Sequence, residues 1–348
     1  MNRSPPDAGR APCACGACAA RNAAIDIHAH FFPEAYLDLI AREGGAHGAE
    51  FVDHHGTRAL RVGTLFTGPL APRFIDLDLR IEAMDRQGVE AQALSLTQPM
   101  VYWADDALSE RLAVVYNDGL AEAALQHPGR LYGLAILPMQ TPALAIREAR
   151  RSATLPGIRG VYMATCVLDR ELGDEAFWPV YEVLEDLGLP VFLHPLNVIG
   201  MTDRLRPYFL SNLLGNPFDN AIAAAHLMFS GVMDRFPRLE VVLPHGGGAF
   251  PFLLGRLAHG WSVRRECKHL AASPMEYARR FHYDTITHDP VALRFLIDRV
   301  GADRVLLGSD YCFDMGTEDP RGAVGALANL PAADRELILS GNACRLLG

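Results

Sequence analysis

Five residues of types that bind divalent metal ions follow short apolar segments in this 348-residue sequence. His28 and His30 stand two apart at the end of the first such segment, and His194 and His245 end the segments PVFLH and EVVLPH. Asp310 follows a fourth segment, RVLLGSD. Imidazole and carboxylate groups together suit a borderline cation such as Zn²⁺, and they tolerate Mn²⁺ as well. The five residues therefore predict a metal site.

Eight short apolar runs, which alternate with segments of helical periodicity, are the predicted strands. They are Ala24–His28, Ala91–Leu96, Leu131–Leu137, Gly157–Met163, Pro190–His194, Glu240–His245, Phe281–Ile286 and Arg304–Ser309. The predicted helices include Leu77–Gln87, Leu108–Gln126, Ala143–Ser152, Glu175–Leu187, Asp219–Phe236 and Pro290–Val300. Such alternation is typical of a parallel sheet, and eight strands can close into a (β/α)₈ TIM-type barrel of the α/β class.

A doubly wound open sheet is the alternative fold. It would usually carry a glycine-rich phosphate turn after its first strand, where this sequence has His28-Ala29-His30. The barrel is therefore favoured. Strand side chains repeat with a period of two, so His28 and His30 point to the same side. Because barrel enzymes place their sites at the carboxyl ends of the strands, all five candidate ligands are expected at one rim.

One segment, residues 45–75, departs from the alternation of strands and helices. Its strand-like patches Glu50–Val52 and Arg58–Val62 flank His54-His55-Gly56. We expect a small inserted hairpin here, after the first strand and helix and before the predicted helix Leu77–Gln87.

The remaining organisation is simple. Residues 1–22 are predicted to be a mobile N-terminal tail, and residues 23–348 to form the barrel. Three cysteines in the tail, Cys13, Cys15 and Cys18, could bind a soft metal, but no fourth ligand lies nearby in the sequence. A mobile tail is therefore the favoured interpretation.

Composition excludes several classes of protein. Half of the residues are hydrophobic and 21% are charged, as in a globular enzyme. The formal net charge of −9 argues against a nucleic-acid partner. No apolar run approaches the roughly 18 residues of a membrane span. The first 20 residues lack the apolar core of a secretory signal, so a cytoplasmic location with reduced thiols is expected.

Several motifs resemble the amidohydrolase superfamily and, within it, the aminocarboxymuconate-semialdehyde decarboxylase family. They are IDIHAHFFPE (25–34), RIEAMDRQGVEAQALS (80–95), LPMQTPALAI (137–146), FLHP (192–195), GVMDRFPRLEVVLPHGGGAFPFLLGR (231–256), HYDTITHDP (282–290) and RVLLGSDYCFDMG (304–316). The resemblance covers roughly residues 23–348. It implies a metal-dependent carboxy-lyase built on the predicted barrel.

The resemblance also implies roles for the candidate ligands. Four of them, His28, His30, His194 and Asp310, would hold a single Zn²⁺ per subunit, with Mn²⁺ as the alternative ion. His245 matches the catalytic histidine of the family, which lies near the metal-bound water and is not a ligand. Asp310 would be a ligand that can also relay protons.

Three further residues are implied to bind a small carboxylate substrate. Arg61 resembles the arginine of the inserted hairpin that contacts a substrate carboxylate, and Trp103 matches a residue lining the pocket. Arg256 resembles a second carboxylate-binding arginine, which in this family reaches the site from the neighbouring subunit. A homodimer follows from that match.

Lysine is almost absent from the chain, since Lys268 is the only one. Superfamily members with two metals often bridge them by a carboxylated lysine on the fourth strand. The predicted fourth strand, GIRGVYM, has none. A single metal is therefore favoured.

The predicted activity is the non-oxidative decarboxylation of a small unsaturated or aromatic carboxylic acid. A Lewis-acidic metal stabilises the charge left on carbon, a histidine moves the proton, and arginines hold carboxylates. A hydratase or hydrolase of the same superfamily is the alternative, and a non-catalytic metal-binding barrel is the third. Leu196-Asn197 stands where the family has a tryptophan-containing loop, so the exact substrate stays open.

Overall fold

The computed structural model describes residues 23–196 and 203–348. The predicted N-terminal tail, with Cys13, Cys15 and Cys18, and also Asn197 lie outside the described residues.

Eight parallel strands form the central sheet, and their spatial order follows their order along the chain. They are β1 (Ile25–His30), β5 (Ala91–Ser95), β6 (Leu131–Ile136), β7 (Ile158–Ala164), β10 (Val191–His194), β11 (Val241–Leu243), β12 (Phe281–Asp284) and β13 (Val305–Leu306). The first and last strands also meet, because the amide of Ile27 donates to the carbonyl of Leu307 at 2.9 Å. The amide of Asp310 donates to the carbonyl of His28, also at 2.9 Å. These bonds close the barrel that the sequence predicts.

The strands are buried on both faces, which is why they read as continuous apolar runs and not as alternating ones. Two predicted boundaries differ from the structure. The first strand continues to His30, so both histidines of the HAH motif lie inside β1. The last strand is β13, which ends at Leu306. The chain from Leu307 to Asp310, which leads to the site, is not part of a regular strand.

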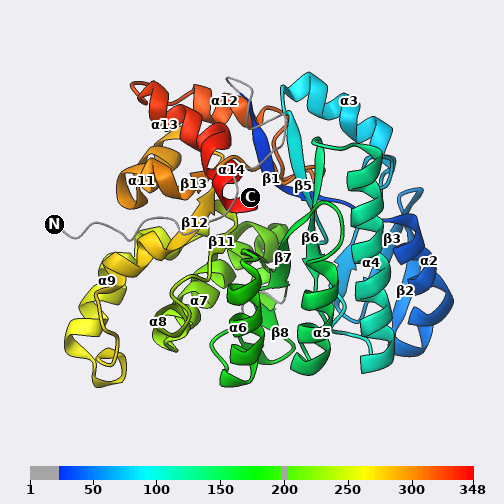
Figure 1. Cartoon of the computed structure of the whole chain (residues 1–348), viewed down its shortest axis with the longest axis horizontal. Helices are drawn as coiled ribbons and strands as arrows, with labels where there is room; N and C mark the ends of the chain where they lie inside the picture. The colour runs from blue at the N-terminus through cyan, green and yellow to red at the C-terminus, as the bar shows by residue number, and fades with distance from the viewer. Residues whose placement is uncertain (1–22, 197–202) are drawn as a thin grey trace.

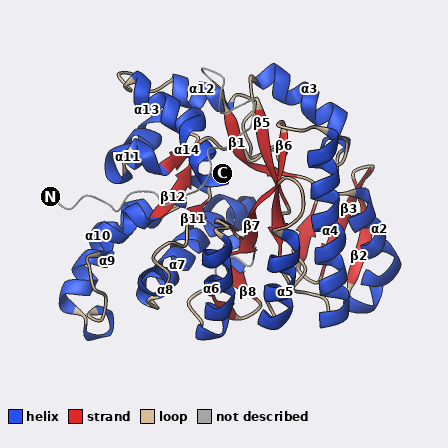
Figure 2. Cartoon of the chain, viewed as in Figure 1, coloured by secondary structure: helices blue, strands red, loops and turns tan. Residues whose placement is uncertain are grey.

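Helices surround the strands in Figure 2. They are α2 (Glu34–Glu43), α3 (Leu77–Gln87), α4 (Asp106–Gln126), α5 (Pro142–Ser152), α6 (Trp178–Leu187), α7 (Asn216–Phe229), α8 (Val232–Arg235), α9 (Phe250–Val263), α10 (Pro274–Tyr277), α11 (Pro290–Val300), α12 (Pro320–Gly325), α13 (Ala332–Glu336) and α14 (Asn342–Leu347). Aspartate side chains cap several of them, including Asp76 on α3 and Asp289 on α11. None of the helices in the described ranges combines the length and apolar character that crossing a bilayer requires.

Two predicted helices differ in detail. The single helix expected over Asp219–Phe236 is wrong, because Gly231 adopts a left-handed conformation (φ 88°) and separates α7 from α8. The first turn of the helix expected over Glu175–Leu187 is a 3₁₀ turn that the carboxylate of Asp174 caps.

The predicted hairpin is present after β1 and α2, and it carries a third strand. The strands β2 (Ala49–His54), β3 (Thr57–Val62) and β4 (Leu65–Thr67) form an antiparallel sheet. His55 and Gly56 form the tight turn with positive φ angles of 53° and 81°. A 3₁₀ turn, Pro72–Phe74, then leads into α3. This inserted sheet appears at the right of Figure 1, beside α2 and α4.

Candidate metal centre

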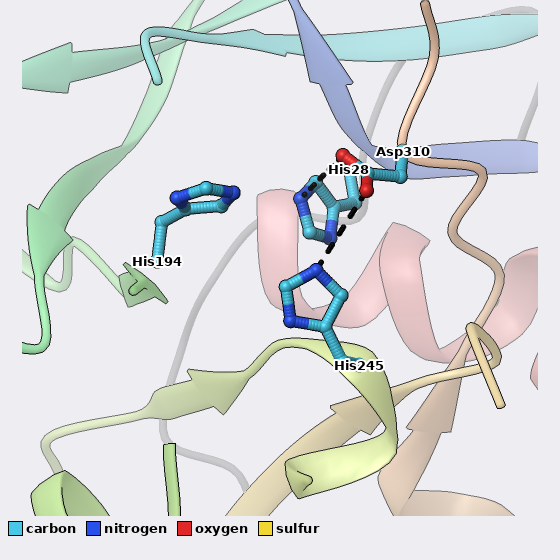
Figure 3. A group of neighbouring side chains, drawn as sticks. All are labelled: His28, His194, His245 and Asp310. Carbon is cyan, nitrogen blue, oxygen red and sulfur yellow. Dashed lines mark ion pairs between the residues drawn. The ribbon is translucent and has the colours of Figure 1, made fainter. Parts of the chain in front are cut away.

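The five candidate ligands meet at the carboxyl ends of the barrel strands. His28 and His30 come from β1, His194 from the end of β10, and His245 and Asp310 from the turns after β11 and β13. Ligand atoms of His28, His194, His245 and Asp310 all lie within 4.8 Å of one another. Figure 3 shows these four side chains around a common space. His30 joins them, since its Nε2 lies 2.9 Å from Oδ1 of Asp310.

Glycines shape the turn that presents His245. The backbone of His245 itself has a φ of 55°, and Gly246, Gly247 and Gly248 also have positive φ angles. A Cβ atom on Gly248 would lie 2.1 Å from the carbonyl oxygen of Pro217, so that position accepts only glycine. The glycines of the HGGG motif are therefore needed for the backbone conformation that places His245 in the site.

Asp284, at the end of β12, holds this turn in place. Its Oδ2 accepts hydrogen bonds from the His245 amide at 2.9 Å and from Nδ1 of His28 at 2.8 Å. Its Oδ1 accepts from the amides of Gly246 at 2.8 Å and Ile286 at 3.0 Å. Because these donors occupy both carboxylate oxygens, Asp284 orients a candidate ligand and the turn that carries His245 together.

Two of the histidines have their Nδ1 atoms engaged as donors. Nδ1 of His28 donates to the carboxylate of Asp284, and Nδ1 of His194 donates to the carbonyl of Pro195 at 2.9 Å. A neutral imidazole carries one proton, so Nε2 of each ring has a free lone pair. Both histidines therefore have a nitrogen atom available to bind a metal ion.

His30 is held in the same way. The hydroxyl of Ser95 donates to the carbonyl of Ala29 at 3.1 Å, so it accepts from Nδ1 of His30, which lies 3.3 Å away. The Nε2 lone pairs of His28 and His30 then face Oδ1 of Asp310 at 3.5 and 2.9 Å. Nε2 of His28 is buried and has no hydrogen-bond partner. A divalent cation between these electron-pair donors would satisfy all three, so the residues fit a metal ion.

His245 carries its proton on the other nitrogen. The side-chain amide nitrogen of Asn220 donates to the carbonyl of Pro244 at 3.1 Å and lies 3.2 Å from Nδ1 of His245. A carbonyl oxygen can only accept, so the group of Asn220 that faces it is the amide NH₂ group and not the amide oxygen. The same NH₂ group faces Nδ1 of His245, which therefore accepts a hydrogen bond from it. The neutral ring therefore has its proton on Nε2, which lies 3.7 Å from Oδ2 of Asp310. This arrangement is suited to a proton donor.

The charged groups of the cluster favour the binding of a cation. Burial lowers the pKa of His30 to about 4 and that of His194 well below its usual value. Burial would raise the pKa of Asp310, but the neighbouring histidines, His245 foremost, hold it well below its usual value. Burial opposes the charge on His28, yet the hydrogen bond to Asp284 and the nearby carboxylates raise its pKa. The two carboxylates and the uncharged His30 and His194 therefore favour a positive charge at this point, which a bound cation would supply.

Two cavities meet at His245 and Asp310, which line both. The larger has a volume of about 690 Å³ and the smaller about 400 Å³. Residues lining the larger cavity include Leu65, Phe66, Arg73, Phe74, His194 and Phe313. The smaller cavity has apolar walls that include Leu213, Phe252, Ile286 and Phe295. A small organic acid can therefore reach the candidate metal centre.

The predicted substrate-binding residues lie elsewhere. Arg61 forms an ion pair with Glu50 at 2.6 Å on the exposed side of the inserted sheet. The indole nitrogen of Trp103 donates to the carbonyl of Met100 at 3.0 Å. Arg256 is exposed on α9. None of these three lines either cavity in the described part of the chain, so their roles stay predictions.

Sequence reasoning missed two residues that position the site. Asp284 ends an apolar strand, exactly as the candidate ligands do, and that signal could have identified it. Asn220 lies within α7 and has no comparable signal, because only the fold brings it to His245. Leu196, which stands where the family has a tryptophan-containing loop, lines the larger cavity.

Known proteins resemble this chain over most of its length. A family model described as amidohydrolase matches residues 25–348. The chain is 34% identical over 333 residues to 2-amino-3-carboxymuconate-6-semialdehyde decarboxylase of Dictyostelium discoideum, covering 94% of this chain and 92% of that protein. The crystal structure of 5-carboxyvanillate decarboxylase from Sphingomonas paucimobilis superposes with a TM-score of 0.81 at 27% identity, covering 94% and 99% of the two chains.

A third similar protein was solved with a metal. It is dihydroxybenzoic acid decarboxylase from Polaromonas sp. JS666, with bound manganese and the inhibitor 2-nitroresorcinol. It superposes with a TM-score of 0.76 at 27% identity, covering 94% of this chain and 97% of that one. All three of these similar proteins are named decarboxylases.

Proposed function

Because this chain belongs to the amidohydrolase family, we propose that its centre catalyses the metal-dependent, non-oxidative decarboxylation of a small aromatic or unsaturated carboxylic acid. The chain is thus a carboxy-lyase. The observation that carries the proposal is the opposite protonation of neighbouring rings. His28 and His194 present lone pairs to a common point, while His245 presents an N–H group beside them.

Decarboxylation needs these two functions together. The bond between carbon and the departing carboxylate breaks, CO₂ leaves, and the electron pair stays on the substrate carbon. A bound divalent cation supplies Lewis acidity that stabilises this charge. His245 takes up a second proton from solvent, donates the Nε2 proton that forms the new C–H bond, and returns to its neutral form. Asn220 orients the ring so that Nε2 faces Asp310. Asp310, 3.7 Å from Nε2, accepts and returns protons during turnover.

The proposed cofactor is one Zn²⁺ ion per chain, held by His28, His30, His194 and Asp310, with Mn²⁺ as the alternative. Nitrogen and carboxylate ligands tolerate both ions, and a similar decarboxylase was solved with manganese. No lysine lines either cavity in the described residues, which supports one ion over a lysine-bridged pair. A cytoplasmic location remains a prediction.

The direct test is a time course with 2-amino-3-carboxymuconate semialdehyde and zinc-loaded protein, following CO₂ release and ultraviolet absorbance together. We expect CO₂ from the wild type and none from Asp310→Ala. Should the semialdehyde give none, 2,6-dihydroxybenzoate and 5-carboxyvanillate are the next substrates. Absence of CO₂ from all three, with metal bound, would contradict the proposal. Consumption of substrate without CO₂ would indicate a hydratase or hydrolase.

We also propose a homodimer in which Arg256 of each chain completes the site of the other. Arg256 lies one helical turn after Phe252 on α9, so both stand on the same face of the helix. Phe252 lines the smaller cavity and is 80% exposed. An exposed aromatic side chain at a cavity mouth, with an arginine beside it, supports a protein partner on this face.

Complementation tests this dimer. Arg256→Ala and His245→Asn chains are each expected to be inactive alone. After unfolding and refolding as a mixture, one active site forms in each mixed dimer, so about a quarter of wild-type activity should return. Refolding each variant alone is the control. A mixture as inactive as its components would contradict the shared site.

A further inference from the structure

Two asparagines border the place where the two cavities meet. Asn212 and Asn216 line both cavities, as His245 and Asp310 do. Among the described residues, Met315 is the only other one that lines both. Asn212 and Asn216 therefore lie beside the candidate metal centre, although the proposed reaction gives them no part.

The start of α7, which carries Asn216, is fixed against the site. The carbonyl of Pro217 accepts a hydrogen bond from the amide of Ala249 at 3.0 Å. Asn216 stands four residues before Asn220, so the two lie on the same face of the helix. Because Asn220 lies 3.2 Å from Nδ1 of His245, this is the face that turns toward the site. Asn216 is thus held beside the cavities by the same contacts that orient His245.

A π turn precedes α7 and carries Asn212. The turn comprises Ser211–Gly215, and the amide of Asn216 donates to the carbonyl of Ser211 across five residues. Single π turns occur frequently at functional sites. Here the turn places Asn212 at the same cavity junction as Asn216.

The side-chain amides of Asn212 and Asn216 have no partner of their own. Both residues are half-buried, and neither side chain makes a hydrogen bond within the ranges that the structure describes. Leu213 and Phe252 belong to the apolar wall beside them. A ligand that fills the junction with apolar atoms would strip water from these amides at a cost, whereas a ligand with a matching polar group would restore their hydrogen bonds.

The chemistry of an amide defines that polar group. Each asparagine offers two N–H donors and one acceptor oxygen, and it carries no charge. Asp310 lies at the same junction, so a second anion is disfavoured there. A neutral group that both donates and accepts, as a hydroxyl does, complements the pair.

We propose that Asn212 and Asn216 bind a neutral hydroxyl substituent of the substrate, and that they select substituted acids over the unsubstituted parent acid. The inference rests on the proposed function, since the substituent is carried by the acid whose carboxylate is lost at the metal centre. Asn220 orients His245, and the two asparagines that precede it on the chain recognise the ligand.

Binding of matched probes tests this pair without requiring turnover. Benzoate and its 2-, 3- and 4-hydroxy derivatives differ only in the hydroxyl group, and calorimetry with zinc-loaded protein measures each. We expect wild type to bind at least one derivative more tightly than benzoate. Leucine resembles asparagine in size but forms no hydrogen bond. Asn212→Leu and Asn216→Leu should each weaken that derivative about fivefold and leave benzoate within about twofold, as expected for one neutral hydrogen bond.

Gln126→Leu is the matched control, because this amide is exposed at the end of α4 and lines neither cavity. It should bind all four probes as wild type does. Metal content and circular dichroism confirm that each variant is folded, and alanine replaces leucine in any variant that is not. Sedimentation reports whether a variant changes its oligomeric state.

Three results would overturn the proposal. The first is equal affinity of wild type for all four probes. The second is a hydroxyl preference that survives in both Asn212→Leu and Asn216→Leu, since another group would then bind the hydroxyl. The third is a change of oligomeric state in these variants, which would show that the amides contact a partner chain. The expected loss of preference without CO₂ release from any acid would refute the proposed function and leave the subsite intact.

Discussion

Replacement of His245 by asparagine should lower kcat by about 10²-fold or more and leave the metal content of the protein unchanged. In the neutral form of the His245 ring the proton is on Nε2, because Nδ1 accepts from Asn220. The variant removes the proton donor and spares the lone pairs of His28 and His194. Turnover with a decarboxylated substrate and metal analysis by mass spectrometry measure the two effects separately.

This experiment also decides between two readings of the cluster. Distances alone admit His245 as a ligand, since its ring nitrogen belongs to the group of ligand atoms that lie within 4.8 Å of one another. If His245 were a ligand, His245→Asn would lose affinity for the metal together with activity, and that result would contradict the assignment. His226→Asn is the matched control, because His226 is exposed on α7 and should keep both metal and turnover.

The barrel and the candidate ligands at its rim are predictable because one local rule produces both. Strands buried on two faces read as apolar runs, and a polar residue that ends such a run lies at the rim where the site forms. His194 and Asp310 were identified by that rule. Asp284 also satisfies it, yet the rule cannot distinguish a carboxylate that binds metal from one that binds backbone amides.

Other features depend on the path of the chain in space. Asn220 reaches His245 only because α7 packs beside the turn after β11. Arg73 reaches the cavity because the inserted sheet, with its unpredicted third strand β4, returns the chain to the rim. Arg61 pairs with Glu50 across two strands on the exposed side of the inserted sheet, and the substrate role that the motif match gives it stays a prediction.

Removal of the metal should abolish activity and destabilise the fold. The buried carboxylates of Asp284 and Asp310 have lowered pKa values and stay ionised at neutral pH. A bound cation would offset these two negative charges. Binding of an ion to the folded state alone stabilises it by about 4 kcal/mol when free metal is 1,000 times the dissociation constant. Denaturant unfolding with and without a chelator measures this difference, and added Zn²⁺ or Mn²⁺ should restore both properties.

The pH dependence of metal binding has a defined sign. The pKa of His28 in the metal-free cluster lies above its ordinary value of 6.5, so a proton and the metal compete for Nε2 over the neutral range. Apparent metal affinity should therefore fall as the pH is lowered through that pKa and level off above it.

Asp310→Asn, which removes a ligand charge and keeps the shape, is expected to bind little metal and to unfold at the same denaturant concentration with or without chelator. Full metal occupancy in Asp310→Asn would show that these side chains do not form the metal centre. The same conclusion would follow if the wild type unfolded at the same denaturant concentration with and without the chelator.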